Sequence, residues 1–347
     1  MGQNGNGQTP DGAVQVVERL LATAIDRGAS DLHLDPDGNG VTVSLRRDGV
    51  LETIETLDGN LAPNLVGRLK ALSDLLAYRT DVPQEGRIPA DRTAHGVEVR
   101  VATFPALDGE RVALRFDAPD GAPAEIAELG LPADAARGLT RAVEQPEGLI
   151  LLTGPSGSGK TTTLYSIVRH LARQTPRRSI VTVEDPVERR LAGVTQTEVN
   201  RPAGLDFARA LRSLLRQDPD VILVGEIRDA ETAAIALEAG LTGHLVASTI
   251  HAGTGRQVYA RLLEMGIEPF VIATAVKGVL AQRLLRKREG GRVLAAEWAP
   301  MTEDLRRSVM ERAVTDDGGE ELRRAARELV SKGLTDEQEV TRVLGDI

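Results

Sequence analysis

A glycine-rich segment in the middle of the chain carries the residues best suited to phosphate chemistry. Residues 154–161 read Gly-Pro-Ser-Gly-Ser-Gly-Lys-Thr and fit the pattern G-x-x-x-x-G-K-[ST]. The glycines permit a tight backbone turn that directs successive N–H groups at phosphate oxygens. The ammonium of Lys160 can reach the outer phosphates, and the hydroxyl of Thr161 can ligate Mg²⁺. The predicted triphosphate-binding residues are Gly154, Pro155, Ser156, Gly157, Ser158, Gly159, Lys160, Thr161 and Thr162.

The flanking residues supply the structure that such a loop requires. The apolar run Leu149–Thr153 predicts a buried strand before the loop, and a helix is expected to begin at Lys160. The positive end of that helix dipole would face the bound phosphates. A tight glycine turn before an ordinary helix would explain the glycines but not the lysine.

Acidic residues follow two further apolar runs. Glu226 comes after Val221–Val224, which we expect to lie directly beside the phosphate-loop strand, and Glu184 ends the run that starts at Ile180. Because ligands bind at the carboxyl ends of parallel strands, both carboxylates are predicted to converge on a magnesium ion. Glu226 would polarise the attacking water or hold a metal-bound water. The alternatives are a solvated loop carboxylate at Glu226 and a turn carboxylate at Asp185.

The second half of the chain alternates apolar runs with helical segments, which predicts an α/β fold with a parallel sheet and helices on both faces. After about residue 262 the pattern is interpreted as helical to the end, apart from residues 286–292. The expected strands are Leu149–Thr153, Ser179–Glu184, Val221–Gly225 and Leu245–Thr249.

The first part of the chain predicts a smaller α+β domain. Apolar residues at helical spacing end at Gly28, and short alternating strands follow around a helix at Leu61–Leu76. Clustered Pro, Gly and Ala indicate a linker. The predicted divisions are a flexible tail at 1–12, an α+β domain at 13–118, a linker at 119–125 and a larger domain at 126–347 with a helical region from about 263.

Composition narrows the range of functions. The formal charge is −9 and the chain has no long block of Lys or Arg. This composition disfavours a protein whose main function is to bind nucleic acid, so no direct nucleic-acid partner is expected. The chain has no cysteine, which excludes disulfides and thiolate zinc sites, so no zinc is expected. Neither a signal-peptide pattern nor a long apolar run is present, which indicates a cytoplasmic chain.

Several motifs in order make the chain similar to a known family. From about Ala29 onward it resembles the ATPases of type II secretion and type IV pilus assembly. The motifs are Ala29-Ser-Asp-Leu-His-Leu-Asp-Pro36, Arg46-Arg-Asp-Gly-Val-Leu51, Gln84-Glu-Gly-Arg-Ile88, Val183-Glu-Asp-Pro-Val-Glu188, Gln217-Asp-Pro-Asp-Val-Ile-Leu-Val-Gly-Glu-Ile-Arg-Asp229 and Thr242-Gly-His-Leu-Val-Ala-Ser-Thr-Ile-His251.

This resemblance implies a RecA-like P-loop ATPase domain preceded by a PAS-like domain. It implies Mg²⁺-dependent hydrolysis of ATP by a homo-hexamer that powers assembly of a pseudopilus or pilus. The partners would be platform and adaptor proteins of the inner membrane, with the ATPase peripheral on the cytoplasmic side. A pilus-retraction ATPase, a motor for DNA transfer, and an ATP-binding regulator or scaffold with little turnover are the alternatives.

The resemblance also implies roles for individual residues. Glu184 would belong to a catalytic acidic box, and His244 and His251 to a histidine box that senses or transmits the nucleotide state. Arginine fingers would come from Arg100 and Arg111 of the first domain, with Arg115 behind them and Arg228 as a further option. The chain departs from the family in lacking the tetracysteine zinc module and the longer amino-terminal docking domain, which puts that docking route in doubt.

Overall fold

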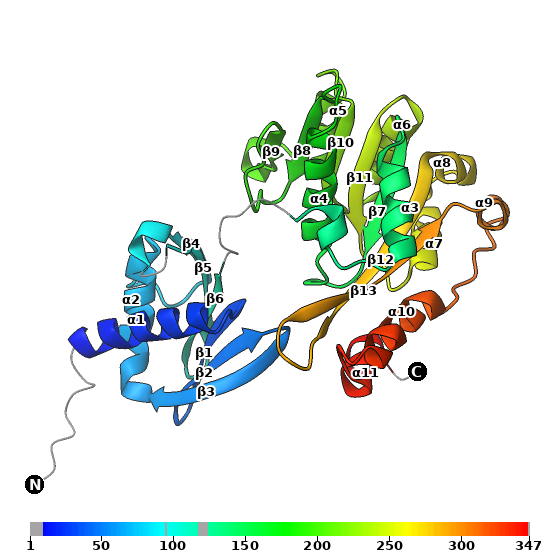
Figure 1. The fold of residues 1–347 in the computed structure, drawn as a ribbon. Helices are drawn as coiled ribbons and strands as arrows, with labels where there is room; N and C mark the ends of the chain where they lie inside the picture. Colours follow the sequence, from blue (N-terminus) through cyan, green and yellow to red (C-terminus); the bar gives the residue numbers. More distant parts are fainter. Residues whose placement is uncertain (1–9, 94–95, 117–123, 346–347) are drawn as a thin grey trace, which may run out of the picture. The chain divides into compact units, whose positions relative to one another are not determined.

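The computed structural model describes residues 10–93, 96–116 and 124–345. The chain divides into two compact units, Met1–Gly121 and Ala122–Ile347 (Figure 1). Most of the predicted tail lies outside the described residues, and a helix, α1, already begins at Pro10. Of the predicted linker, only residues 124 and 125 are described.

The first unit is a six-stranded antiparallel sheet covered by two helices. On β1, Leu32 and Leu34 point into a core shared with α1 and α2, because successive side chains of a strand face opposite sides. The strand order is β3-β2-β1-β6-β5-β4. The elements are α1 (Pro10–Asp26), β1 (Asp31–Asp37), β2 (Gly40–Arg47), β3 (Val50–Asp58), α2 (Ala62–Leu72), β4 (Gln84–Ile88), β5 (Val99–Ala106) and β6 (Gly109–Phe116).

The second unit contains a seven-stranded sheet in the order β13-β12-β7-β11-β10-β8-β9. Its ladders are parallel except for that between β12 and β13, so the predicted parallel sheet is confirmed. The strands are β7 (Gly148–Thr153), β8 (Ile180–Glu184), β9 (Thr195–Glu198), β10 (Val221–Ile227), β11 (Leu245–Ile250), β12 (Val276–Arg286) and β13 (Arg292–Pro300).

Helices cover both faces of this sheet, as the alternation along β7 shows. Leu149 and Leu151 pack in one core with α5 to α8, whereas Ile150 and Leu152 pack in another with α3 and α4. The carboxyl-terminal α10 and α11, red in Figure 1, pack on β12 and β13. The helices are α3 (Ala133–Val143), α4 (Lys160–Ala172), α5 (Phe207–Leu214), α6 (Ala230–Leu241), α7 (Gly255–Glu264), α8 (Pro269–Ala275), α9 (Glu303–Met310), α10 (Glu320–Ser331) and α11 (Glu337–Leu344).

Two expectations about this unit are wrong. The stretch from residue 263 is not helical throughout, because β12 and β13 form a hairpin that extends the sheet. β12 is buried on both faces, so its apolar residues do not alternate with polar ones, and without this alternation its pattern could not be told from that of a buried helix. Furthermore, β10 does not lie directly beside β7, since β11 runs between them. Within the described residues, no helix combines the length and apolar character needed to cross a bilayer.

Candidate active site

The predicted phosphate loop connects the buried strand β7 to the start of α4. Its glycines have backbone angles that favour glycine, with φ of +148° at Gly154, +75° at Gly157 and +91° at Gly159. A Cβ atom at Gly154 would lie 2.5 Å from the carbonyl oxygen of Gln282 on β12. The loop is therefore a tight cradle that a side chain at this position would disrupt.

Lys160 and Ser158 place polar groups at this cradle. The Lys160 Nζ donates to the carbonyl oxygens of Gly154 at 2.7 Å and Pro155 at 2.9 Å. Burial lowers the pKa of Lys160, while the negative charge of Glu226 acts in the opposite direction. The Ser158 hydroxyl is buried and has no hydrogen-bond partner in the described part of the chain. A cation, an unsatisfied hydroxyl and a helix N-terminus fit the oxygens of a polyphosphate.

The loop is held from β12 by Gln282, whose side chain is fully buried. Its Nε2 donates to the Ser158 carbonyl oxygen at 2.7 Å, and its Oε1 accepts from the Thr163 hydroxyl at 3.1 Å. Sequence reasoning missed Gln282 because this segment was interpreted as helical. Because β12 is buried on both faces, its sequence has no strand alternation that could have signalled Gln282.

Glu226 lies in an irregular part of β10. Val224 pairs with Ser248 and Ile227 with Ile250, so β10 has one residue more than β11 across this interval. Such a bulge changes the direction of a side chain locally. The bulge is stabilised by a hydrogen bond in which the Thr249 hydroxyl donates to the Gly225 carbonyl oxygen at 2.9 Å.

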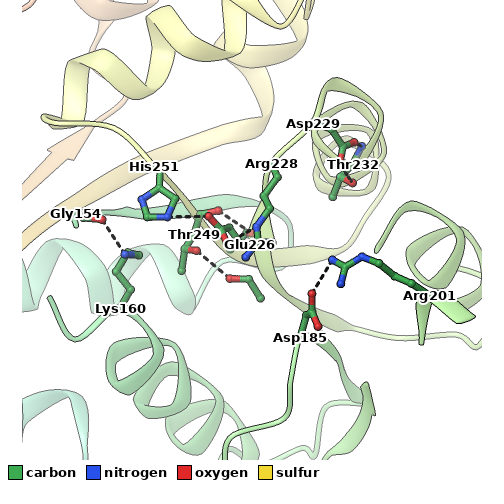
Figure 2. A network of polar contacts seen from close by, with 12 residues as sticks. Gly154, Lys160, Asp185, Arg201, Glu226, Arg228, Asp229, Thr232, Thr249 and His251 are labelled. Carbon is green, nitrogen blue, oxygen red and sulfur yellow. Dashed lines mark hydrogen bonds and ion pairs between the residues drawn. The ribbon is translucent and has the colours of Figure 1, made fainter. Parts of the chain in front are cut away.

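The carboxylate of Glu226 is surrounded by basic side chains. Its Oε1 lies 3.0 Å from His251 Nε2, and its Oε2 accepts from Arg228 Nε at 2.7 Å. The side chain is 16% exposed, so it is shielded but still reachable. Figure 2 shows this group and Lys160 at the same end of the sheet, contributed by α4, β10 and the segment after β11. The structure thus brings together the predicted residues Lys160, Glu226 and His251.

Gly225 precedes Glu226 where many phosphate-loop enzymes carry an aspartate. A Cβ atom here would lie 3.3 Å from the Val183 carbonyl oxygen and 3.4 Å from the Glu184 Cα. The close backbone of β8 therefore leaves little room for a side chain at this position.

Glu184 lies at the end of β8, next to β10, but in different surroundings. It is 4% exposed, and its carboxylate accepts from the hydroxyls of Tyr165 at 2.5 Å and Thr182 at 2.6 Å, and from the Gln196 amide at 3.0 Å. Burial and the adjacent carboxylate raise the pKa of Tyr165, which keeps its proton available for donation. The predicted convergence of both carboxylates on one metal is not seen in this geometry, and the catalytic role of Glu184 stays a prediction.

The acidic residue after Glu184 has a basic partner of its own. Asp185 forms an ion pair with Arg201 at 2.7 Å (Figure 2). Arg228, a predicted arginine-finger option, is bonded to Glu226 within its own unit.

The two predicted histidines lie at opposite ends of β11. His251 follows the strand and contacts Glu226, whereas His244 precedes it. At about 3.3 Å per residue the strand separates them by roughly 20 Å. His244 Nδ1 lies 3.1 Å from the Ala239 carbonyl oxygen, and its own carbonyl accepts from Gly148, where β7 begins. Only His251 therefore contacts Glu226, and the sensing or transmitting role of both histidines stays a prediction.

The predicted arginine fingers lie on one face of the first unit's sheet. Arg100 on β5 is directly opposite Arg115 on β6, and Arg111 occupies the same face of β6. The Arg111 guanidinium is paired with Asp35 at 2.6 Å. Their action on a bound nucleotide stays a prediction.

No cluster of three or more His, Asp or Glu suitable for a metal ion occurs in the described residues. Mg²⁺ in phosphate sites is usually held by one or two protein groups together with phosphate oxygens and water. The Thr161 hydroxyl, in the first turn of α4, has the chemistry for such a ligand.

Comparisons with known proteins agree with this architecture. The family described as "Type II/IV secretion system protein" matches residues 8–342. The chain is 44% identical over 273 residues to the "Type II secretion system ATPase E" of Vibrio cholerae, covering 79% of this chain and 54% of that protein. It is 43% identical over 275 residues to the "Type IV pilus assembly ATPase PilB" of Thermus thermophilus, covering 79% of this chain and 31% of that protein.

A solved structure of the "Pilus Retraction Motor PilT and Bound ADP" matches with a TM-score of 0.68 and 29% identity, covering 95% of this chain and 97% of the other. The chain spans about half the length of the first curated relatives that it matches. The family match covers both units, and the identity to the relatives extends over most of the chain. This chain therefore belongs to the type II/IV secretion system protein family.

Proposed function

We propose that this protein is a magnesium-dependent ATPase that powers assembly of a type II secretion pseudopilus or a type IV pilus. The observation that carries the proposal is the juxtaposition of Lys160 in the glycine loop with Glu226 and its basic partners, at one end of a parallel sheet. The relatives named as ATPases of secretion and pilus assembly support the same activity and cargo.

In this proposal the chain itself performs three tasks on ATP. The loop N–H groups, Lys160 and the N-terminus of α4 hold the phosphates. The Glu226 carboxylate orients the attacking water and accepts its proton, while His251 and Arg228 fix the carboxylate in place. Bound Mg²⁺ supplies positive charge to the outer phosphate oxygens, and Thr161 would hold it directly, with Glu226 acting through water.

The remaining predictions describe the assembly. We propose a homo-hexamer in which Arg100 or Arg111 supplies positive charge to the terminal phosphoryl group, as arginine fingers do in other phosphoryl-transfer enzymes. The ring would act on platform and adaptor proteins at the cytoplasmic side of the inner membrane. The acidic charge of −9 disfavours direct work on nucleic acid.

Phosphate release by purified protein tests the activity. Wild-type protein should release phosphate from ATP in the presence of Mg²⁺ and lose this activity when EDTA is added. Lys160→Ala should abolish it, because the variant lacks the ammonium group at the cradle. Equal phosphate release by the wild type and this variant would contradict the proposal.

Retraction of a pilus is the second candidate, favoured by the match to the retraction motor. Expression in cells that lack their assembly motor separates the two functions. Surface pili should return if the protein assembles them, and should stay absent if it only retracts them. An ATP-binding regulator is the remaining alternative, and it would be favoured if Glu226→Gln left the turnover unchanged.

A further inference from the structure

Arg283 is a buried cation beside the phosphate loop that sequence reasoning did not single out. It follows Gln282 on β12 and is 8% exposed. Its Nη1 donates to the Gln282 carbonyl oxygen at 2.9 Å, and its Nη2 donates to the Gly253 carbonyl oxygen at 2.6 Å. Both acceptors are neutral, so its charge is hydrogen-bonded but not neutralised.

Two other buried or partly buried cations of the chain do have carboxylate partners. Lys70 is fully buried, and its Nζ lies 2.6 Å from Glu110. Arg286, three positions after Arg283 on β12, pairs with Glu339 at 3.1 Å. Within the part of the chain that the structure describes, no carboxylate pairs with Arg283, and burial lowers the pKa of its guanidinium. A buried charge without a counter-ion is unfavourable, which indicates that an anionic group completes this site.

The position of Arg283 identifies where that anion would lie. Its Nη1 is 3.1 Å from the point that a Cβ atom of Gly154 would occupy, at the start of the phosphate loop. Its charge also contributes to lowering the pKa of Lys160, after burial and against the effect of Glu226. Arg283 and Lys160 therefore act electrostatically on the same space.

The second hydrogen bond of Arg283 connects it to the segment that carries His251. Gly253 belongs to the segment between β11 and α7, two residues after His251. Since His251 contacts Glu226, Arg283 links the strand that supports the phosphate loop to the segment that holds the Glu226 partner.

We propose that Arg283 is a further cationic member of the triphosphate site, whose unneutralised charge attracts the polyphosphate and whose Nη2 positions the His251 segment. The inference rests on the proposed binding of ATP and names a residue that this binding requires. The ligand chemistry is a polyphosphate, either as part of a nucleotide or as inorganic tripolyphosphate.

Binding measurements on the full chain with ligands of graded charge test the proposal. Arg283→Gln should weaken the affinity for ATP about 10- to 100-fold and for ADP less, because the variant lacks a positive charge beside the phosphate loop and ATP carries more negative charge than ADP. Tripolyphosphate should lose affinity as ATP does, and adenosine should not. Arg283→Lys keeps the charge but not both hydrogen bonds, so it should bind ATP more tightly than Arg283→Gln and less tightly than the wild type.

The matched control is Arg286→Gln, which removes an arginine from the same strand whose charge is already neutralised by Glu339. It should leave the affinity for ATP unchanged. Thermal unfolding without nucleotide reports on folding, and Arg283→Met provides a second variant should the glutamine variant unfold. Because Met removes the charge without leaving another polar group, this variant should stay folded and show a smaller ATP-induced rise in Tm than the wild type.

Unchanged ATP affinity in Arg283→Gln would overturn the proposal, as would an equal loss for adenosine, which indicates a purely structural role. Binding of tripolyphosphate does not depend on ATP hydrolysis, so this measurement can fail or succeed independently of the proposed ATPase activity. If the wild type binds tripolyphosphate through Arg283 but hydrolyses no ATP, the ATPase proposal fails and the role of Arg283 stands.

Discussion

Two glutamates, Glu226 and Glu184, leave neighbouring strands at the same edge of the same sheet, and their surroundings differ in kind. Glu226 contacts His251 and Arg228 and keeps 16% of its side chain exposed. Glu184 is 4% exposed and accepts three hydrogen bonds from the neutral side chains of Tyr165, Thr182 and Gln196. A strand end determines where a residue lies, whereas the adjoining elements determine what its side chain contacts.

The difference suggests that the two carboxylates have different roles. The bulge of β10 directs Glu226 toward cations and leaves it reachable by water. Tyr165 is part of α4, so Glu184 fastens the helix that follows the phosphate loop to β8 and, through Gln196, to β9. We expect Glu226 to act on the substrate and Glu184 to position α4.

The largest expected effect is a difference in turnover between Glu226→Gln and Glu184→Gln. A residue that accepts a proton from water typically contributes about 10²- to 10⁴-fold in rate, so Glu226→Gln should lose that much while it still binds ATP. Glu184→Gln keeps an oxygen acceptor for Tyr165 and should stay within about tenfold of the wild type. Phosphate release at saturating ATP measures both. The reverse order of the two losses would break the comparison.

Truncating Glu184 should affect stability more than its conversion to glutamine. Glu184→Ala removes the acceptor from three buried donors, each of which then costs about 1–3 kcal/mol unless water replaces the carboxylate. Chemical denaturation should show a loss of about 3 kcal/mol for the alanine variant and a smaller loss for glutamine. Equal stability of Glu184→Ala and the wild type would show that these hydrogen bonds do not hold α4 in place.

The two histidines that flank β11 allow the effect of a contact with Glu226 to be compared with that of a distant substitution. His251→Ala removes a partner that orients Glu226 and should lower turnover about 10- to 100-fold. His244→Ala acts at the far end of β11 and should change turnover less than about twofold, since roughly 20 Å separates it from Glu226. Steady-state rates of the two purified variants measure this, and equal losses would contradict the assignment of His251 alone to the site.

The smallest expected effect concerns a carboxylate whose surroundings disfavour its negative charge. Glu297 on β13 has an Oε2 without a partner in the described residues, and burial, with Asp317 and Glu321, raises its pKa to about 7. Its folded-state pKa exceeds the ordinary value of 4.5, so its charge lowers stability progressively as the pH rises from 4.5 to about 7. Glu297→Gln should therefore raise stability by about 1–3 kcal/mol at pH 8 and have little effect at pH 4.

Glu339 is the matched control of opposite sign. Burial opposes its ionisation, but hydrogen bonds from Arg342 and Arg286 lower its pKa overall. The ionised Glu339 carboxylate therefore stabilises the fold above pH 4.5, and this stabilisation is lost as the pH falls through its lowered pKa. Glu339→Gln should thus destabilise the protein at pH 8, and a loss of stability in Glu297→Gln at that pH would refute the account of Glu297.

The sequence was sufficient to predict the phosphate loop, the parallel sheet and the placement of Glu226 at a strand end. Each depends on local patterns, namely glycine spacing around Lys160 and apolar runs that end in an acidic residue. The family and its motifs added His251, which the structure places against Glu226.

The remainder depends on contacts between segments far apart in the chain. Gln282 and Arg283 meet the phosphate loop only because β12 pairs with β7, and the lack of strand alternation in the sequence of β12 concealed that strand. The surroundings of Glu184 depend on Tyr165 and Gln196, which no local spacing connects to it.

The structure of the protein bound to magnesium and a non-hydrolysable ATP analogue tests the central claim most directly. The account predicts that the terminal phosphate lies at the Lys160 loop, that a water bridges it to the Glu226 carboxylate, and that Glu184 remains bonded to Tyr165. A Glu226 side chain directed away from the terminal phosphate in every subunit, with Glu184 in its place, would contradict the account.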